Sequence, residues 1–125
     1  MAAVHSKDTR PEMAVRRLVY SLGYRYRLHA KDLSGHPDLV FRRRKKVLFV
    51  YGCFWHRHRC CQYATTPKSR IAFWNAKFAA NVARDRRNVR ELKKAGWHIL
   101  AVWQCQLKNP NALVKRIHEF LKSDH

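Results

Sequence analysis

Acidic residues are scarce in this chain. Eight Asp and Glu stand against 27 Lys and Arg among 125 residues, which gives a formal net charge of +19. Such an excess favours a polyanionic partner, because each cation placed near a phosphate releases condensed counterions. Nucleic acid is therefore the first candidate. The charge alone separates neither DNA from RNA nor an enzyme from a ribosomal-type RNA-binding protein.

The chain also lacks an apolar run long enough to span a bilayer. Its first residues, MAAVHSKDTRPE, lack the apolar stretch of a signal peptide. We therefore expect a cytoplasmic bacterial protein with no membrane partner. Disulfides are disfavoured in that compartment, so the four cysteines are predicted to be reduced thiols or metal ligands.

Glycine and proline are few, with four of each, and no linker, repeat or low-complexity tract divides the chain. The hydrophobic content of 46% is sufficient for a core. We expect a single domain over residues 1–125. Hydrophobic periodicity, turn residues and helix caps predict the order α-β-β-β-α-β-α, with helices at 9–22, 68–94 and 109–122 and strands at 24–29, 38–41, 47–51 and 97–103. That order predicts an α/β or α+β sandwich in which helices flank a mixed sheet.

Two short segments carry further expectations. Thr9 and Glu12 have the spacing of a helix capping box, which by itself explains the glutamate fully. The block 42–46 holds five consecutive cations, Arg42, Arg43, Arg44, Lys45 and Lys46, and suits a hairpin tip held against DNA phosphates.

Cysteine and histidine gather in the pattern C-x4-H-x-C, with one more cysteine far downstream. Cys53, His58, Cys60 and Cys105 offer thiolates and an imidazole, which suit Zn²⁺. Four such ligands leave no open position, so this zinc would be structural. His56 and Cys61 are rival ligands that spacing does not exclude, and buried structural cysteines with surface histidines are the plain alternative.

Chemistry is expected from a carboxylate and an imidazole. Asp38 follows Pro37 at the entry of a strand, where it can hold Mg²⁺ against a scissile phosphate, although an ordinary Pro-Asp turn explains it as well. His56 is the natural general base at neutral pH. Large rings beside cations suit insertion between base steps, and Phe54, Trp55 and Trp74 are candidates for it. The flanking charges favour this role over core packing for Phe54 and Trp55.

Five segments resemble the very short patch repair (Vsr) endonucleases, bacterial nickases specific for T:G mismatches. They are GHPDLVF at 35–41, FVYGCFWHRHRC at 49–60, ATTPKSRIAFW at 64–74, NVARDRRN at 81–88 and GWHILAVWQC at 96–105. The resemblance runs colinearly over residues 7–122. It implies a restriction-endonuclease-like fold, catalytic Mg²⁺, structural Zn²⁺, and a nick 5′ to the mismatched thymine. It also implies T:G-mismatched double-stranded DNA as substrate, a monomer associated with the nucleoid, and mismatch-repair proteins as candidate partners.

The same resemblance implies roles for individual residues. Asp38 matches the metal-binding aspartate, with a second metal contact from the main-chain carbonyl of Val50. His56 matches the catalytic histidine, and Glu12 a glutamate near the active site. The zinc ligands are matched by Cys53, His58, Cys60 and Cys105, and the aromatic wedge by Phe54, Trp55 and Trp74.

Two departures from the family pattern affect the expected activity. Tyr51 stands where the family often has a histidine that assists catalysis. As a catalytic residue its phenol, with a pKa near 10, could hydrogen-bond a phosphate oxygen but is a poor base at neutral pH. The chain also begins close to its first predicted helix, without the longer arm that helps clasp DNA. The alternative prediction is therefore a catalytically weakened mismatch-binding or nucleic-acid-binding protein of the same fold.

Overall fold

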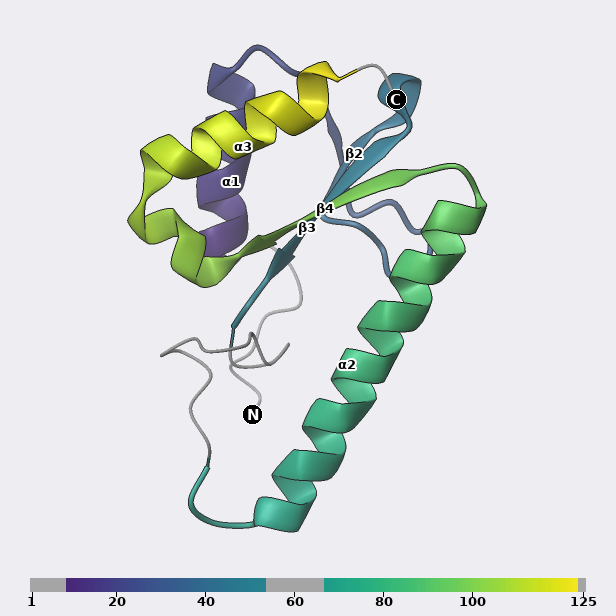
Figure 1. Ribbon diagram of the computed structural model, residues 1–125, viewed down its shortest axis with the longest axis vertical. Helices are drawn as coiled ribbons and strands as arrows, with labels where there is room; N and C mark the ends of the chain where they lie inside the picture. Colours follow the sequence, from purple (N-terminus) through teal and green to yellow (C-terminus); the bar gives the residue numbers. More distant parts are fainter. Residues whose placement is uncertain (1–8, 54–66, 124–125) are drawn as a thin grey trace.

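The computed structural model describes residues 9–53 and 67–123 (Figure 1). Its helices are α1 (Arg10–Ser21), α2 (Ile71–Lys94) and α3 (Pro110–Lys122), and its strands are β1 (Arg27–Leu28), β2 (Leu39–Phe41), β3 (Lys46–Tyr51) and β4 (His98–Trp103). Short 3-10 turns, η1 (Arg42–Arg44) and η2 (Gln104–Lys108), complete the order. The predicted sequence of elements is confirmed.

The four strands form one mixed sheet in the order β1-β2-β3-β4. The first two pairings are antiparallel, whereas β3 and β4 run parallel, with Tyr51 beside Trp103 at their carboxyl ends. The connection between β3 and β4 includes the long helix α2, as a parallel crossover requires. A mixed sheet flanked by helices is the predicted arrangement, and it is compatible with a restriction-endonuclease-like fold.

Alternate residues of β3 face the two sides of the sheet, with α1 and α3 on one side and α2 on the other (Figure 1). Leu48 belongs to a core cluster with α1 and α3, to which Val15, Val19, Leu113, Ile117 and Leu121 contribute. Val47, Phe49 and Tyr51 belong to a second cluster with Leu92 of α2 and Trp97. Because β3 is covered on both sides, it reads as a continuous apolar run, which is how the sequence predicts it.

Helix α1 begins as the sequence predicts. The Thr9 hydroxyl accepts a hydrogen bond from the Glu12 backbone N–H at 3.3 Å, and Pro11 occupies the first turn. The helix ends before Gly23, which takes φ +89° and donates its N–H to the Tyr20 carbonyl at 2.9 Å.

The predicted strand 24–29 is shorter in the structure, because only Arg27 and Leu28 pair with β2. His29 then adopts φ 47°, a left-handed conformation that ends the strand. Tyr24 and Tyr26 pack against the α1/α3 side of the core instead of forming a longer ladder.

The turn that precedes Asp38 is held against helix α2. Ser34 donates a hydrogen bond to the Glu91 carboxylate at 2.6 Å. A Cβ on Gly35 would lie 2.9 Å from the Asn88 side-chain nitrogen, and Gly35 has φ +78°, so only glycine fits this approach. The long helix thus helps to fix the chain that delivers Asp38 to the sheet. Among the described residues, no helix combines the length and apolar character needed to cross a bilayer.

Candidate active site

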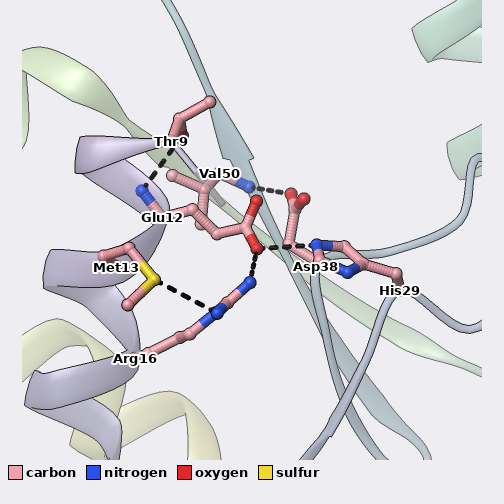
Figure 2. A network of polar contacts seen from close by, with 7 residues as sticks. All are labelled: Thr9, Glu12, Met13, Arg16, His29, Asp38 and Val50. Atoms are coloured by element: carbon pink, nitrogen blue, oxygen red, sulfur yellow. Dashed lines mark hydrogen bonds and ion pairs between the residues drawn. The ribbon is translucent and has the colours of Figure 1, made fainter. Parts of the chain in front are cut away.

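Glu12 carries the first carboxylate of the candidate site. It lies in the first turn of α1 and is 2% exposed. Its Oε2 accepts hydrogen bonds from Arg16, one turn further along α1, and from His29 Nε2 at 2.6 Å (Figure 2). The capping interpretation is therefore incomplete: Thr9 caps the helix, but the Glu12 carboxylate is held by a guanidinium and an imidazole.

Asp38 carries the second carboxylate, at the entry of β2. Its Oδ2 accepts a hydrogen bond of 2.7 Å from the Val50 N–H on the adjacent strand β3 (Figure 2). Burial, together with the neighbouring Glu12 carboxylate, raises the pKa of Asp38 to about 7, while the Val50 N–H and Arg16 oppose the shift. Two carboxylates in one poorly solvated place therefore resist being charged together.

His29 completes the cluster from the end of β1. Its backbone N–H donates to the Asp38 carbonyl at 3.3 Å, while its ring reaches Glu12. Glu12, His29 and Asp38 each offer one ligand atom, and these atoms lie within 4.8 Å of one another. Three separate elements thus bring two carboxylates and an imidazole together beside the Val50 backbone, a donor set that suits a divalent cation.

Val50 and Asp38 are two of the predicted residues that the structure brings together. The contact involves the Val50 N–H, whereas the sequence interpretation assigns its carbonyl to the metal. His56, the predicted base, lies outside the described residues, as do Phe54, Trp55, His58 and Cys60.

Tyr51 lies next in β3 but belongs to the opposite face of the sheet. Only 8% exposed, it packs against Phe49 and Trp103, with ring centroids 5.5 and 5.1 Å away. Burial, together with the charges of Asp85 and Asp38, raises the pKa of the phenol above its ordinary value. The phenol therefore stays protonated at neutral pH and cannot act there as a base.

The Tyr51 ring also lines an open groove of about 480 Å³ between the strand ends and α2. Its apolar floor and basic rim are formed by Tyr51, Val82, Asp85, Arg86, Val89, Arg90, Lys93 and Trp103. On α2, Val82, Asp85 and Val89 are half-buried at this groove, while Phe78 and Leu92 are buried.

Cys53 and Cys105 are the two predicted zinc ligands that the structure describes. Each lies two residues beyond its strand, and these strands, β3 and β4, are parallel neighbours, so both cysteines follow the same edge of the sheet. The Gln104 side chain bridges the two segments by accepting the Cys53 N–H at 3.4 Å. Both cysteines are thiols rather than disulfide partners.

The basic tip differs from its prediction at one position. Arg42, Arg43, Arg44 and Lys45 are exposed, but Lys46 is 1% exposed and belongs to β3. Its ammonium donates to the carbonyl oxygens of Phe120 at 2.6 Å and Leu121 at 3.3 Å, at the carboxyl end of α3. Lys46 therefore binds the last carbonyls of a helix instead of DNA phosphates, because β-strand alternation turns it inward.

Three of the exposed tip cations also have contacts within the protein. Arg42 pairs with Asp32 at 2.7 Å, Arg44 lies 4.9 Å from the centroid of the Tyr24 ring, and Lys45 lies 4.8 Å from that of Trp97. These contacts orient the cations while leaving them accessible to a polyanion.

Trp74, the remaining member of the predicted wedge, is half-buried near the start of α2. It stacks on Phe78 with ring centroids 5.7 Å apart, and it contacts the exposed Phe73 edge-on at 5.2 Å. In Figure 1 this end of α2 extends well past the sheet. The ring thus belongs to a small aromatic group with Phe73 and Phe78 in the first turns of α2.

Arg16 and His29 are site residues that the sequence interpretation misses. The spacing of Arg16, four residues after Glu12, is a usable signal for an ion pair on a helix. His29 has no comparable signal, because its proximity to Glu12 depends on how β1 crosses the start of α1 in three dimensions.

Comparison with known proteins identifies the family. The family model described as DNA mismatch endonuclease Vsr matches residues 1–62. The type II nicking enzyme V.XorIIP of Xanthomonas oryzae pv. oryzae is 52% identical, over 97% of this chain and 88% of its own length. V.NmeAIP of Neisseria meningitidis is 39% identical, over 98% of this chain and 86% of its own length.

DNA mismatch endonuclease Vsr of Escherichia coli is 36% identical, over 97% of this chain and 80% of its own length. These matches include the Glu12, His29 and Asp38 segments as well as both strands that precede the cysteines. With relatives of this identity along nearly its whole length, the chain belongs to the Vsr family of DNA mismatch endonucleases.

Proposed function

We propose that the protein nicks duplex DNA on the 5′ side of the mismatched thymine in a T:G pair, by Mg²⁺-assisted phosphodiester hydrolysis. The observation that carries the proposal is the carboxylate pair of the buried Glu12 and the half-buried Asp38 beside the Val50 backbone, on a protein with a net charge of +19. The names of the relatives agree with it, since one is a mismatch endonuclease and others are nicking enzymes.

The donor set fits the proposed cation. Asp38 and the main-chain carbonyl of Val50 would hold Mg²⁺, with Glu12 close by, because this ion prefers carboxylate and carbonyl oxygens. Burial of two nearby carboxylates also favours a divalent counter-charge at this place. When bound, Mg²⁺ would supply positive charge that stabilises the negative charge developing on the scissile phosphate.

The protein's own groups supply the remaining chemistry. His56 takes a proton from the attacking water, whose oxygen forms a bond to phosphorus as the bond to the 3′ oxygen breaks, and the departing 3′ oxygen takes a proton from solvent water. The products are a 3′-hydroxyl and a 5′-phosphate. Arg16 and His29 orient the Glu12 carboxylate through their hydrogen bonds. Tyr51, buried and protonated, takes no part in proton abstraction.

Zinc and aromatic side chains are assigned supporting roles. A structural Zn²⁺ held by Cys53, His58, Cys60 and Cys105 would fix the segment that follows β3. Phe54, Trp55 and Trp74 would enter the base stack beside the mismatch, and the exposed cations Arg42, Arg43, Arg44 and Lys45 would contact phosphates.

A nicking assay on matched and T:G-containing duplexes, with and without Mg²⁺, tests the proposal. Asp38→Asn keeps an oxygen that can accept the Val50 N–H but removes the charge. We expect it to lower nicking by at least about a thousandfold, a loss typical of an essential electrostatic group, while DNA binding persists. Glu119→Gln, an exposed carboxylate on α3, is the matched control and should nick normally. Undiminished nicking by Asp38→Asn would refute the mechanism.

Tyr51 favours a second candidate function, a mismatch-binding protein with weakened chemistry. Its buried phenol occupies the position at which the family often has a histidine, and its pKa is raised. This candidate predicts tight binding of T:G duplexes without Mg²⁺ and no strand break at any Mg²⁺ concentration. The same assay therefore separates the two functions.

A further inference from the structure

We infer, building on the proposed function, that His29 is a direct nitrogen ligand of the catalytic cation, and that it makes this site bind Mn²⁺ more tightly than Mg²⁺. The relevant geometry is the clustering of one donor atom each from Glu12, His29 and Asp38 within 4.8 Å. To bind the ion, His29 Nε2 would give up the proton that it donates to Glu12, and the neutral ring would keep its proton on Nδ1, so coordination would replace the hydrogen bond to Glu12.

The separations suit a single small ion. Ligand bonds of about 2.1 Å place neighbouring donor atoms of an octahedral ion roughly 3 Å apart and opposite ones roughly 4.2 Å apart. His29 Nε2 already lies 2.6 Å from Glu12 Oε2 (Figure 2). Shifts of a few tenths of an ångström, small enough for side-chain rotation, would bring the donors to coordination distances.

His29 is also held in position by its surroundings. Its backbone N–H bonds the Asp38 carbonyl, and its left-handed φ of 47° directs the side chain away from the strand. The side chain is 21% exposed, against 3% for Glu12, so the imidazole lies on the solvent side of the carboxylate. A cation entering from solvent would meet this nitrogen at the mouth of the site.

The charges around the site explain why a nitrogen donor would change its metal preference. Arg16 already offsets part of the negative charge of Glu12, which weakens the purely electrostatic attraction that Mg²⁺ depends on. Mn²⁺ accepts carboxylates as readily as Mg²⁺ does and lies on the transition-metal scale of nitrogen affinity. A site with two carboxylates and one imidazole therefore favours Mn²⁺.

Electron paramagnetic resonance of Mn²⁺ tests this ligand assignment without relying on activity. Loss of the free-ion signal on titration gives the affinity, and electron spin echo envelope modulation detects a directly bound imidazole nitrogen. We expect nitrogen modulation in the unmodified protein. His29→Asn should lose it, because asparagine tolerates the left-handed backbone but has no imidazole. Its Mn²⁺ affinity should fall about tenfold, whereas Mg²⁺ affinity, measured by competition, should change less than twofold.

His118→Gln is the matched control, since it removes an exposed histidine from α3. It should retain both modulation and affinity. His29→Gln is the second substitution, and circular dichroism with thermal unfolding would check that each protein folds. Absence of nitrogen modulation from the unmodified protein, or its persistence in both folded His29 substitutions, would overturn the ligand assignment.

The outcomes also separate this inference from the proposed function. If His29→Asn binds Mn²⁺ unchanged while Asp38→Asn abolishes Mg²⁺-dependent nicking, His29 is only a positioning residue for Glu12 and the proposed function stands. If Asp38→Asn neither weakens Mn²⁺ binding nor reduces nicking, both fail.

Discussion

At the scale of single residues, the site brings together two poorly solvated carboxylates, an arrangement that by itself destabilises the folded protein. The buried carboxylate of Glu12 lies within reach of the half-buried carboxylate of Asp38, and the pKa of Asp38 is raised to about 7 chiefly by desolvation. A carboxyl group in the unfolded chain has a pKa near 3.9. The ionised Asp38 carboxylate therefore destabilises the metal-free folded protein, as is common for residues kept at a functional site.

The pH dependence of unfolding should reveal this cost. Because the folded-state pKa of Asp38 lies above the unfolded value, the folded state binds the proton more tightly. In metal-free protein, ionisation of Asp38 therefore lowers the free energy of unfolding progressively as pH rises from about 4 to about 7. Above about pH 7 the whole of this loss is present. Asp38→Asn should match the unmodified protein near pH 4 and exceed it by about 1–2 kcal/mol at pH 8.

Urea unfolding at several pH values measures this difference, in buffers containing a chelator too weak to remove Zn²⁺. Adding Mg²⁺ at about 100 times its Kd should return about 2.7 kcal/mol to the unmodified protein and little to Asp38→Asn. Parallel stability curves for the two proteins between pH 4 and pH 8 would contradict the assignment of Asp38.

At the scale of elements, Lys46 shows how strand alternation decides between a buried and a surface cation. Five consecutive cations look alike in the sequence, but the first residue of β3 points between the sheet and the end of α3. Its ammonium satisfies helix-terminal carbonyls that would otherwise be buried without donors.

Lys46→Met should therefore destabilise the protein, although the new side chain is of similar length and apolar. We expect a loss of about 2–3 kcal/mol, since the carbonyls of Phe120 and Leu121 lose a charged donor. Lys45→Met, one residue earlier and exposed, should cost less than about 1 kcal/mol, the scale of one cation–π contact. Denaturant unfolding measures the stability of the two substituted proteins. Equal losses would show that Lys46 does not stabilise the fold by binding the last carbonyls of α3.

The parallel pairing of β3 and β4 leads to a prediction about zinc binding. Cys53 and Cys105 follow neighbouring strand ends, so Cys105 is expected to close a site begun in the loop after β3. Metal analysis should give about one Zn²⁺ per chain, a count set by four protein ligands per ion. Cys105→Ser should lower that content and the unfolding temperature, whereas Gln106→Ala, in the same 3-10 turn, should keep the zinc. Full zinc content in Cys105→Ser would exclude this ligand.

Much of the fold follows from the sequence, because long periodic segments identify their elements. The order of helices and strands, the Thr9 cap and the buried character of β3 are all predicted. Local exceptions are not: the length of β1 depends on a left-handed His29, and the burial of Lys46 depends on where α3 ends. Within the site, Asp38 is predicted from its place after Pro37 at the entry of a strand, whereas the contact of His29 with Glu12 appears only once α1 and β1 are packed together.

At the scale of the whole molecule, exposed positive charge lies on two parts, the domain body and the long helix α2. The domain body holds the carboxylate site, and α2 extends from it past the sheet (Figure 1). Exposed cations occur both on the tip between β2 and β3 and along α2, among them Arg43, Arg84, Arg87 and Lys94. A duplex that reaches the carboxylates therefore meets positive charge from more than one element, which offsets the repulsion between phosphates and the site.

This distribution makes DNA affinity strongly dependent on salt. If the protein neutralises six to ten phosphates, its affinity for duplex DNA should fall about 10³–10⁵-fold between 50 and 200 mM salt. Each contact contributes about 0.9 to the slope of log K against log salt concentration. Arg43→Ala should therefore reduce the slope by about one, equally for matched and T:G duplexes, because a phosphate contact carries no sequence information. Lys115→Ala, an exposed cation on α3, is the matched control. A fluorescence-anisotropy titration at four salt concentrations measures the slopes, and an unchanged slope for Arg43→Ala would remove the β2–β3 tip from the DNA-binding surface.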